Sequence, residues 1–97
     1  MIKYFCMAAD VAIRVSYTVE KRPSLKRPNY TNVLYCSTYV SIPGVPSFNS
    51  RAHIIGCSPD LADIVDSMEV HPDARKPIIE KGSCLRTGQK ATVEVHI

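Results

Sequence analysis

The sequence lacks tryptophan, has only four glycines, and contains no apolar segment long enough to cross a bilayer. A transmembrane helix needs about 20 apolar residues, and a secretory signal needs about 7–15 continuous ones. The apolar start of the chain is interrupted by Asp10 before it reaches that length. These absences predict a cytoplasmic protein with no membrane association, whose cysteines remain thiols.

Signatures of nucleotide-binding and hydrolytic enzymes are also missing. The sequence contains no Walker loop, no G-x-G-x-x-G, no G-x-S-x-G and no H-E-x-x-H. The four cysteines, at positions 6, 36, 57 and 84, form no C-x-x-C pair, and the histidines form no H-x₃-H pair. We therefore expect no catalytic set, no metal site and no cofactor.

Cys57 is the best candidate for a nucleophile, and it supplies a third-ranked hypothesis, a Cys-dependent enzyme. It ends a predicted strand just before a predicted helix, whose dipole favours a thiolate. His53 lies four residues earlier, about 13 Å away along a straight strand. A general base must come within about 3 Å of the proton that it removes. The spacing therefore favours a buried, structural Cys57, and we expect Cys-to-Ser substitutions at all four positions to preserve activity.

What the sequence does contain is an ordinary globular composition, with 45% hydrophobic and 22% charged residues in 97. This length predicts a single domain over residues 1–97. The net charge of +3 is small for a dedicated nucleic-acid binder. The charge is also unevenly distributed. The chain through Cys57 has seven Lys/Arg and two acidic residues, whereas the remainder has five Lys/Arg and seven acidic residues.

Strict alternation of apolar and polar residues marks the strands. It is clearest over residues 11–20, 32–42 and 91–97, and a shorter strand is predicted over residues 51–57. Residues 2–7 are expected to form an N-terminal hairpin with residues 11–20. The proline- and glycine-containing segment 43–50 should not continue a central strand.

One helix is predicted over residues 59–70. Ser58 is a suitable N-cap and Pro59 a suitable first residue. An apolar stripe follows at Leu61, Ile64, Val65 and Met68. Pro72 should end this helix, and Pro77 should prevent a regular helix beyond it, so residues 71–89 have no assigned structure. The sequence thus predicts an α+β fold, a small antiparallel sheet of about five strands with one amphipathic helix packed on one face.

The most distinctive segment is EKRPSLKRPNY at residues 20–30, in which Lys-Arg-Pro occurs twice, five residues apart. Two prolines disfavour a central strand, so the segment is predicted to be an exposed loop joining strands that end near residue 20 and begin near residue 32. Its simplest interpretation is a solvated connector. Its functional interpretation is a partner-binding loop formed by Lys21, Arg22, Leu25, Lys26, Arg27 and Tyr30.

These features favour a small non-enzymatic interaction protein that binds a larger macromolecule, preferably a protein, and inhibits or modulates it. Phage-type inhibitors and accessory factors belong to this class. The alternative is a nucleic-acid-binding protein, or a modulator of a DNA-processing or other nucleic-acid-processing enzyme. Tyr30, Tyr35 and Tyr39 could stack on bases, although no RNP-like motif is present. The seven prolines, most of them in predicted loops, suggest association with a prolyl isomerase as well.

Overall fold

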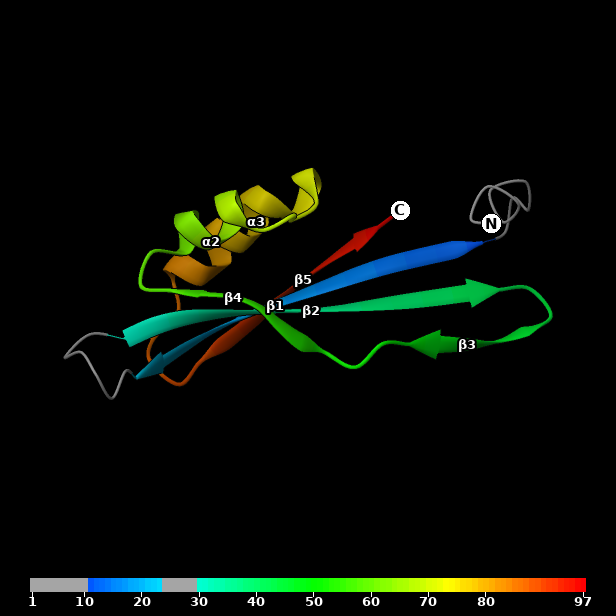
Figure 1. Ribbon diagram of the computed structural model, residues 1–97, viewed down its shortest axis with the longest axis horizontal. Helices are drawn as coiled ribbons and strands as arrows, with labels where there is room; N and C mark the ends of the chain where they lie inside the picture. Colours follow the sequence, from blue (N-terminus) through cyan, green and yellow to red (C-terminus); the bar gives the residue numbers. More distant parts are fainter. Residues whose placement is uncertain (1–10, 24–29) are drawn as a thin grey trace.

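The computed structural model describes residues 11–23 and 30–97, which form a five-stranded antiparallel sheet and two helices (Figure 1). The strands are β1 (Ala12–Pro23), β2 (Tyr30–Ile42), β3 (Val45–Asn49), β4 (His53–Ser58) and β5 (Lys90–His96); the helices are α2 (Leu61–Ser67) and α3 (Pro72–Ser83). The sheet order is β3-β2-β1-β5, and β4 also pairs with β2. The predicted α+β fold with an antiparallel sheet is confirmed. The predicted N-terminal hairpin includes residues 2–7, which lie outside the described residues.

The two long strands carry the alternation that the sequence predicts. On the face that the helices cover, Tyr17 lies opposite Cys36 of β2 and opposite Val93 of β5. Val19 lies opposite Leu34, and both side chains are fully buried. Because strand side chains alternate between faces, Arg14, Ser16, Thr18 and Glu20 of β1 point away from this core.

Helix α2 is shorter than predicted. It begins at Leu61 because Asp60, rather than Ser58, is the N-cap, and the Asp60 side chain accepts a hydrogen bond from the backbone N–H of Ala62 at 3.0 Å. The predicted apolar stripe is nevertheless confirmed, since Leu61, Ile64 and Val65 are buried against the sheet. The helix ends at Ser67, three residues before the predicted end.

Helix α3 shows that the prediction of a single helix was wrong. Pro72 occupies the first position, where no N–H is needed. Pro77 lies inside the helix, but at its sixth residue it removes only the bond to the Asp73 carbonyl near the helix start. Packing outweighs this loss, because Ala74 and Ile78 are fully buried on the face that contacts the sheet.

Both helices lie on the same side of the sheet and cover only one end of it (Figure 1). The principal dimensions are 51 × 23 × 21 Å, so the molecule is elongated along its two long strands. At the other end β3 is exposed throughout, and its Val45 and Phe48 side chains are 51% and 58% exposed. No helix within the described ranges is long and apolar enough to span a membrane.

Two of the edge strands, β3 and β5, carry features that disfavour pairing with another strand. On β3, Pro46 lacks a backbone N–H and lies where the pairing register with β2 shifts. Between β5 and β1, hydrogen-bonded residue pairs alternate with non-hydrogen-bonded pairs. The Ile97 N–H donates to the Ile13 carbonyl, which makes Ile97 and Ile13 a hydrogen-bonded pair. Counting back in register, Thr92 belongs to a non-hydrogen-bonded pair, so its carbonyl points away from β1. The Lys81 ammonium donates to that carbonyl at 3.2 Å. A charged side chain therefore occupies the β5 edge.

Candidate interaction surface

The sheet has a second face that neither of the described helices covers, here called the open face. Register and alternation assign to it Arg14, Ser16, Thr18, Glu20 and Arg22 of β1, Val33, Tyr35, Ser37 and Tyr39 of β2, Ile54 and Cys57 of β4, and Lys90, Thr92, Glu94 and His96 of β5. Ile54 is 54% exposed and is the large apolar residue of this face. The open face is thus a polar surface with tyrosines and one exposed isoleucine.

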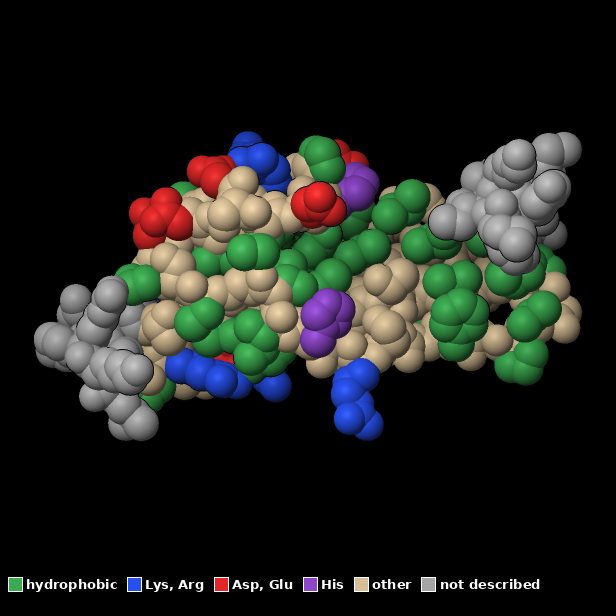
Figure 2. Space-filling view, viewed as in Figure 1, with side chains coloured by type: hydrophobic (Ala, Val, Ile, Leu, Met, Phe, Trp, Pro, Cys, Tyr) green, Lys and Arg blue, Asp and Glu red, His purple; other side chains and the backbone are tan. Residues whose placement is uncertain are grey.

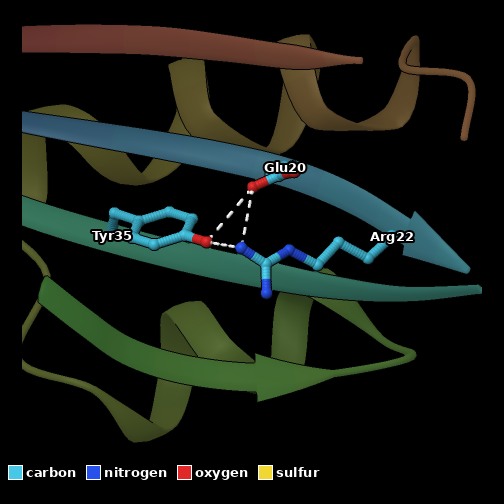
Figure 3. Close-up of polar contacts among 3 residues, drawn as sticks. All are labelled: Glu20, Arg22 and Tyr35. Atoms are coloured by element: carbon cyan, nitrogen blue, oxygen red, sulfur yellow. Dashed lines mark hydrogen bonds and ion pairs between the residues drawn. The ribbon is translucent and has the colours of Figure 1, made fainter. Parts of the chain in front are cut away.

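Glu20, Arg22 and Tyr35 form a hydrogen-bonded cluster on the open face (Figure 3). The guanidinium of Arg22 and the hydroxyl of Tyr35 both donate to Oε2 of Glu20, each at 3.2 Å. Arg22 also donates to the Tyr35 hydroxyl oxygen. The Arg22 hydrogen bond lowers the pKa of Glu20, whereas burial and the hydrogen bond to Glu20 raise the pKa of Tyr35. The cluster therefore holds a charged carboxylate beside a neutral phenol.

A second Arg–Tyr pair lies toward the other end of β1. The Arg14 guanidinium lies over the Tyr39 ring, 4.6 Å from its centroid, and Arg14 Nε is 3.8 Å from Glu94 Oε1. Arg22 lies over Tyr35 in the same manner, 5.6 Å from the ring centroid. Each tyrosine of the open face is therefore combined with an arginine whose charge is balanced by a glutamate.

A pocket of about 300 Å³ opens beside the first cluster and is lined by Thr18, Glu20, Tyr35, Ala52 and Lys90. Lys90 is the direct cross-strand partner of Glu20, and its positive charge also lowers the Glu20 pKa. Lys90 makes no ion pair at salt-bridge distance with any described residue. The pocket rim therefore presents an ammonium group that is available to a partner.

The structure corrects the predicted loop conformation at two residues of the predicted partner-binding segment. Lys21 and Arg22 belong to β1 rather than to a loop, and alternation places them on opposite faces. Lys21 is only 8% exposed, and its ammonium donates to the Leu85 carbonyl at 2.8 Å beyond the end of α3. Arg22 alone joins the open face.

Of the remaining residues of the predicted loop, the structure describes only the backbone of Tyr30. Leu25, Lys26 and Arg27 lie outside the described residues. Tyr30 begins β2, where its backbone pairs with Pro23. Their proposed contact with a partner stays a prediction.

Cys57 and His53 lie on opposite faces of the sheet. A register shift in β4 places Cys57 opposite Val33 on the open face and His53 opposite Cys36 on the helix face. Cys57 is exposed, so the expectation of a buried thiol was wrong. Its sulfur lies 3.5 Å from the Thr31 hydroxyl, and His53, on the other face, is not placed to act as its base. In the described residues, no group of His, Cys, Asp or Glu is arranged to hold a metal ion.

Comparison with known proteins gives no match, whether to a family model, to a curated protein or to a solved structure. What the surface can do must be inferred from its side chains. Arginine and tyrosine are enriched among residues that dominate protein interfaces, and here an arginine of β1 lies over each of the Tyr35 and Tyr39 rings of β2. This arrangement suits binding through hydrogen bonds and ion pairs.

The sequence pattern by itself predicts part of this surface. The alternation of residues 11–20 places Arg14 and Val15 on opposite faces of one strand. The alternation of residues 32–42 does the same for Tyr35 and Leu34 on the next strand. Alternation does not give the register that places Arg14 opposite Tyr39 and Glu20 opposite Lys90. The prediction of a basic loop was wrong at Lys21 and Arg22 because β1 continues to Pro23, where a proline can end a strand.

Proposed function

We propose that this chain is a small non-enzymatic interaction protein, which binds a larger protein through the open face and inhibits or modulates it. The observation that carries the proposal is a sheet face spanning four strands that no described helix covers. Single-layer sheets bury one face in a core and leave the other for solvent or a partner. Two Arg–Tyr pairs and the exposed Ile54 give this face the residue types of an interface centre.

The electrostatics of the open face favour a protein partner over a nucleic acid. Affinity for nucleic acid comes from cations that neutralise phosphates, yet Arg22 and Arg14 already face Glu20 and Glu94, at 3.2 Å and 3.8 Å. Base stacking needs a free aromatic face, and each tyrosine ring already has a guanidinium over one side. Nucleic-acid binding, or modulation of a nucleic-acid-processing enzyme, is therefore the second candidate.

Affinity capture from an extract of the source cells tests the proposal. The bait is the full chain, compared with a Tyr35→Ala/Tyr39→Ala variant and a matched control, Asp66→Ala/Lys76→Ala, on the exposed surface of the helices. Parent and control are expected to retain the same proteins with and without nuclease, and the tyrosine variant is expected to lose them.

Two outcomes contradict the proposal, provided that circular dichroism shows the variants to be folded. Retention of the same proteins by the tyrosine variant would exclude the open face as the binding surface. Loss of all captured proteins on nuclease treatment would support the nucleic-acid alternative instead.

A further inference from the structure

Charge is divided between the two layers of the molecule. Within the described residues, the strands and the segment between β3 and β4 contain five Lys/Arg and two glutamates; residues 59–89, which include both helices, contain four Lys/Arg and six acids. Figure 2 shows acidic side chains gathered over the helices and Lys and Arg side chains projecting from the opposite side. The sheet layer is therefore positive and the helical layer negative.

The pocket on the open face has the same sign as the sheet layer. Its lining includes the Lys90 ammonium and one carboxylate, that of Glu20, and the Arg22 guanidinium, which lies outside the lining, donates to this carboxylate. Two cations against one anion leave a surplus positive charge. Arg22 is engaged by Glu20 and Tyr35, so Lys90 carries the surplus at the rim.

We propose that the open face binds an acidic protein surface, with one carboxylate of the partner seated at this pocket against the Lys90 ammonium. This inference rests on the proposed function and specifies the chemistry of its partner. A carboxylate in this position can accept a charge-assisted hydrogen bond from Lys90. Glu20 on the pocket wall repels an anion that enters deeply, so the carboxylate binds at the rim.

The surroundings of the pocket supply the apolar contact that an ion pair alone lacks. Exposed ion pairs contribute at most about 1 kcal/mol, whereas interface energy is concentrated in desolvated aromatic and apolar anchors. Ile54 is the cross-strand partner of Tyr35 and is 54% exposed. A partner that carries an acidic residue next to an apolar one could therefore satisfy both contacts. The carboxylate would bind at Lys90, and the apolar side chain would pack on Ile54 and Tyr35.

The edge strands β3 and β5 are less suitable for this partner than the open face. Addition of a strand requires a row of free N–H and C=O groups. Lys81 occupies the β5 edge at Thr92, and Pro46 with its irregular register interrupts the β3 edge. Docking on side chains of the open face meets neither obstacle.

The inference is tested with the full-length chain and defined probes. The probes are a fluorescent hexaglutamate peptide, a hexalysine peptide and a single-stranded oligonucleotide of matched charge; binding is followed by fluorescence anisotropy and by NMR shift mapping. We expect saturable binding of hexaglutamate, no binding of hexalysine, and shifted amide signals at Thr18, Tyr35 and Lys90. Lys90→Gln should weaken hexaglutamate binding about threefold to fivefold, the effect of losing an exposed ion pair.

Lys76→Gln is the matched control, because Lys76 is an exposed lysine on α3, and it should leave hexaglutamate binding unchanged. Equal effects of the two substitutions, or shifts confined to the helices, would overturn the inference. Tighter binding of the oligonucleotide than of hexaglutamate, with a steep salt dependence, would overturn it in favour of nucleic acid.

The proposed function and this inference can fail separately. If Tyr35→Ala/Tyr39→Ala abolishes affinity capture but Lys90→Gln leaves both capture and hexaglutamate binding intact, the interaction role stands and the acidic partner is wrong. If the tyrosine variant still captures its proteins, the open-face proposal itself fails.

Discussion

Two adjacent basic residues, Lys21 and Arg22, have different roles because a strand turns successive side chains to opposite faces. Lys21 is buried on the helix side, and its ammonium donates to the Leu85 carbonyl at 2.8 Å. The Lys21 backbone is also hydrogen-bonded to the segment that leads into β5. Its N–H donates to the Gln89 carbonyl, and its own carbonyl accepts from the Gly88 N–H. We therefore regard Lys21 as a structural residue and Arg22 as a surface residue.

Substitution of these two residues should separate the roles. Lys21→Met keeps the aliphatic stem and removes the ammonium, so it should lower the free energy of unfolding by about 1.5–3 kcal/mol, as expected for a lost hydrogen bond from a charged group. Arg22→Met should change it much less, because the Arg22 guanidinium is exposed and solvent screens its ion pair with Glu20. Urea denaturation followed by circular dichroism measures both. Equal effects of the two substitutions would contradict the assignment.

The depressed pKa of Glu20 predicts a pH dependence of stability. A carboxyl whose pKa is lower in the folded than in the unfolded state stabilises the fold above the unfolded pKa, which is about 4.3 for glutamate. That contribution is lost as the pH falls through the lower, folded pKa. Glu20→Gln should therefore be slightly less stable than the parent at neutral pH, and the difference should disappear in acid.

Thermal melts at pH 7 and at a pH well below the Glu20 pKa measure this effect. The difference at neutral pH should be under about 1 kcal/mol, because Glu20 and Arg22 are partly exposed and solvent screens their pair. Glu80→Gln, on the exposed surface of α3, is the control. A Glu20→Gln difference that grows in acid would have the wrong sign for this mechanism.

At the scale of elements, β4 and α2 pack so closely that glycine is required between them. A Cβ added to Gly56 would overlap the Cγ2 methyl of Ile64 and crowd Met68. The methyl cannot move aside without a change of χ1, which is strongly restricted for isoleucine in a helix.

Gly56→Ala therefore sets two effects against each other. Alanine is favoured over glycine within a strand by about 0.5–1 kcal/mol, but overpacking costs about 1–3 kcal/mol. We expect net destabilisation in urea denaturation. In an Ile64→Ala background the overlap is absent, so Gly56→Ala should no longer be destabilising; additivity of the two substitutions would refute close packing as the cause.

The elements differ in how far the sequence predicts them. Alternation identified β1, β2 and β5, and the stripe of Leu61, Ile64 and Val65 identified α2, because those patterns directly reflect which side chains are buried. Helix α3 was missed because two of its three buried residues, Ala74 and Gly82, are too small to form a clear apolar stripe, and Pro77 argues against a helix. The open face depends on strand register, which the pattern of one strand does not contain.

At the scale of the whole molecule, Pro46 and Lys81 should keep β3 and β5 from pairing with strands of further copies. A Pro46→Thr/Lys81→Ala variant restores a backbone donor on β3 and exposes the Thr92 carbonyl on β5. We expect this variant to self-associate as its concentration rises, as measured by sedimentation velocity. Lys76→Ala is the control for loss of a surface charge. A variant that sediments like the parent over the same concentrations would contradict the role of these residues.

The separation of charge between the sheet and the helices makes the molecule an electric dipole. An acidic partner would therefore turn it before contact, with the sheet leading and the helices trailing. Salt limits the range of this orientation, because the Debye length is about 8 Å at physiological ionic strength, far shorter than the 51 Å length of the molecule. Orientation would thus take place in the last steps of approach. It would speed association at low salt and leave the lifetime of the complex to the contacts themselves.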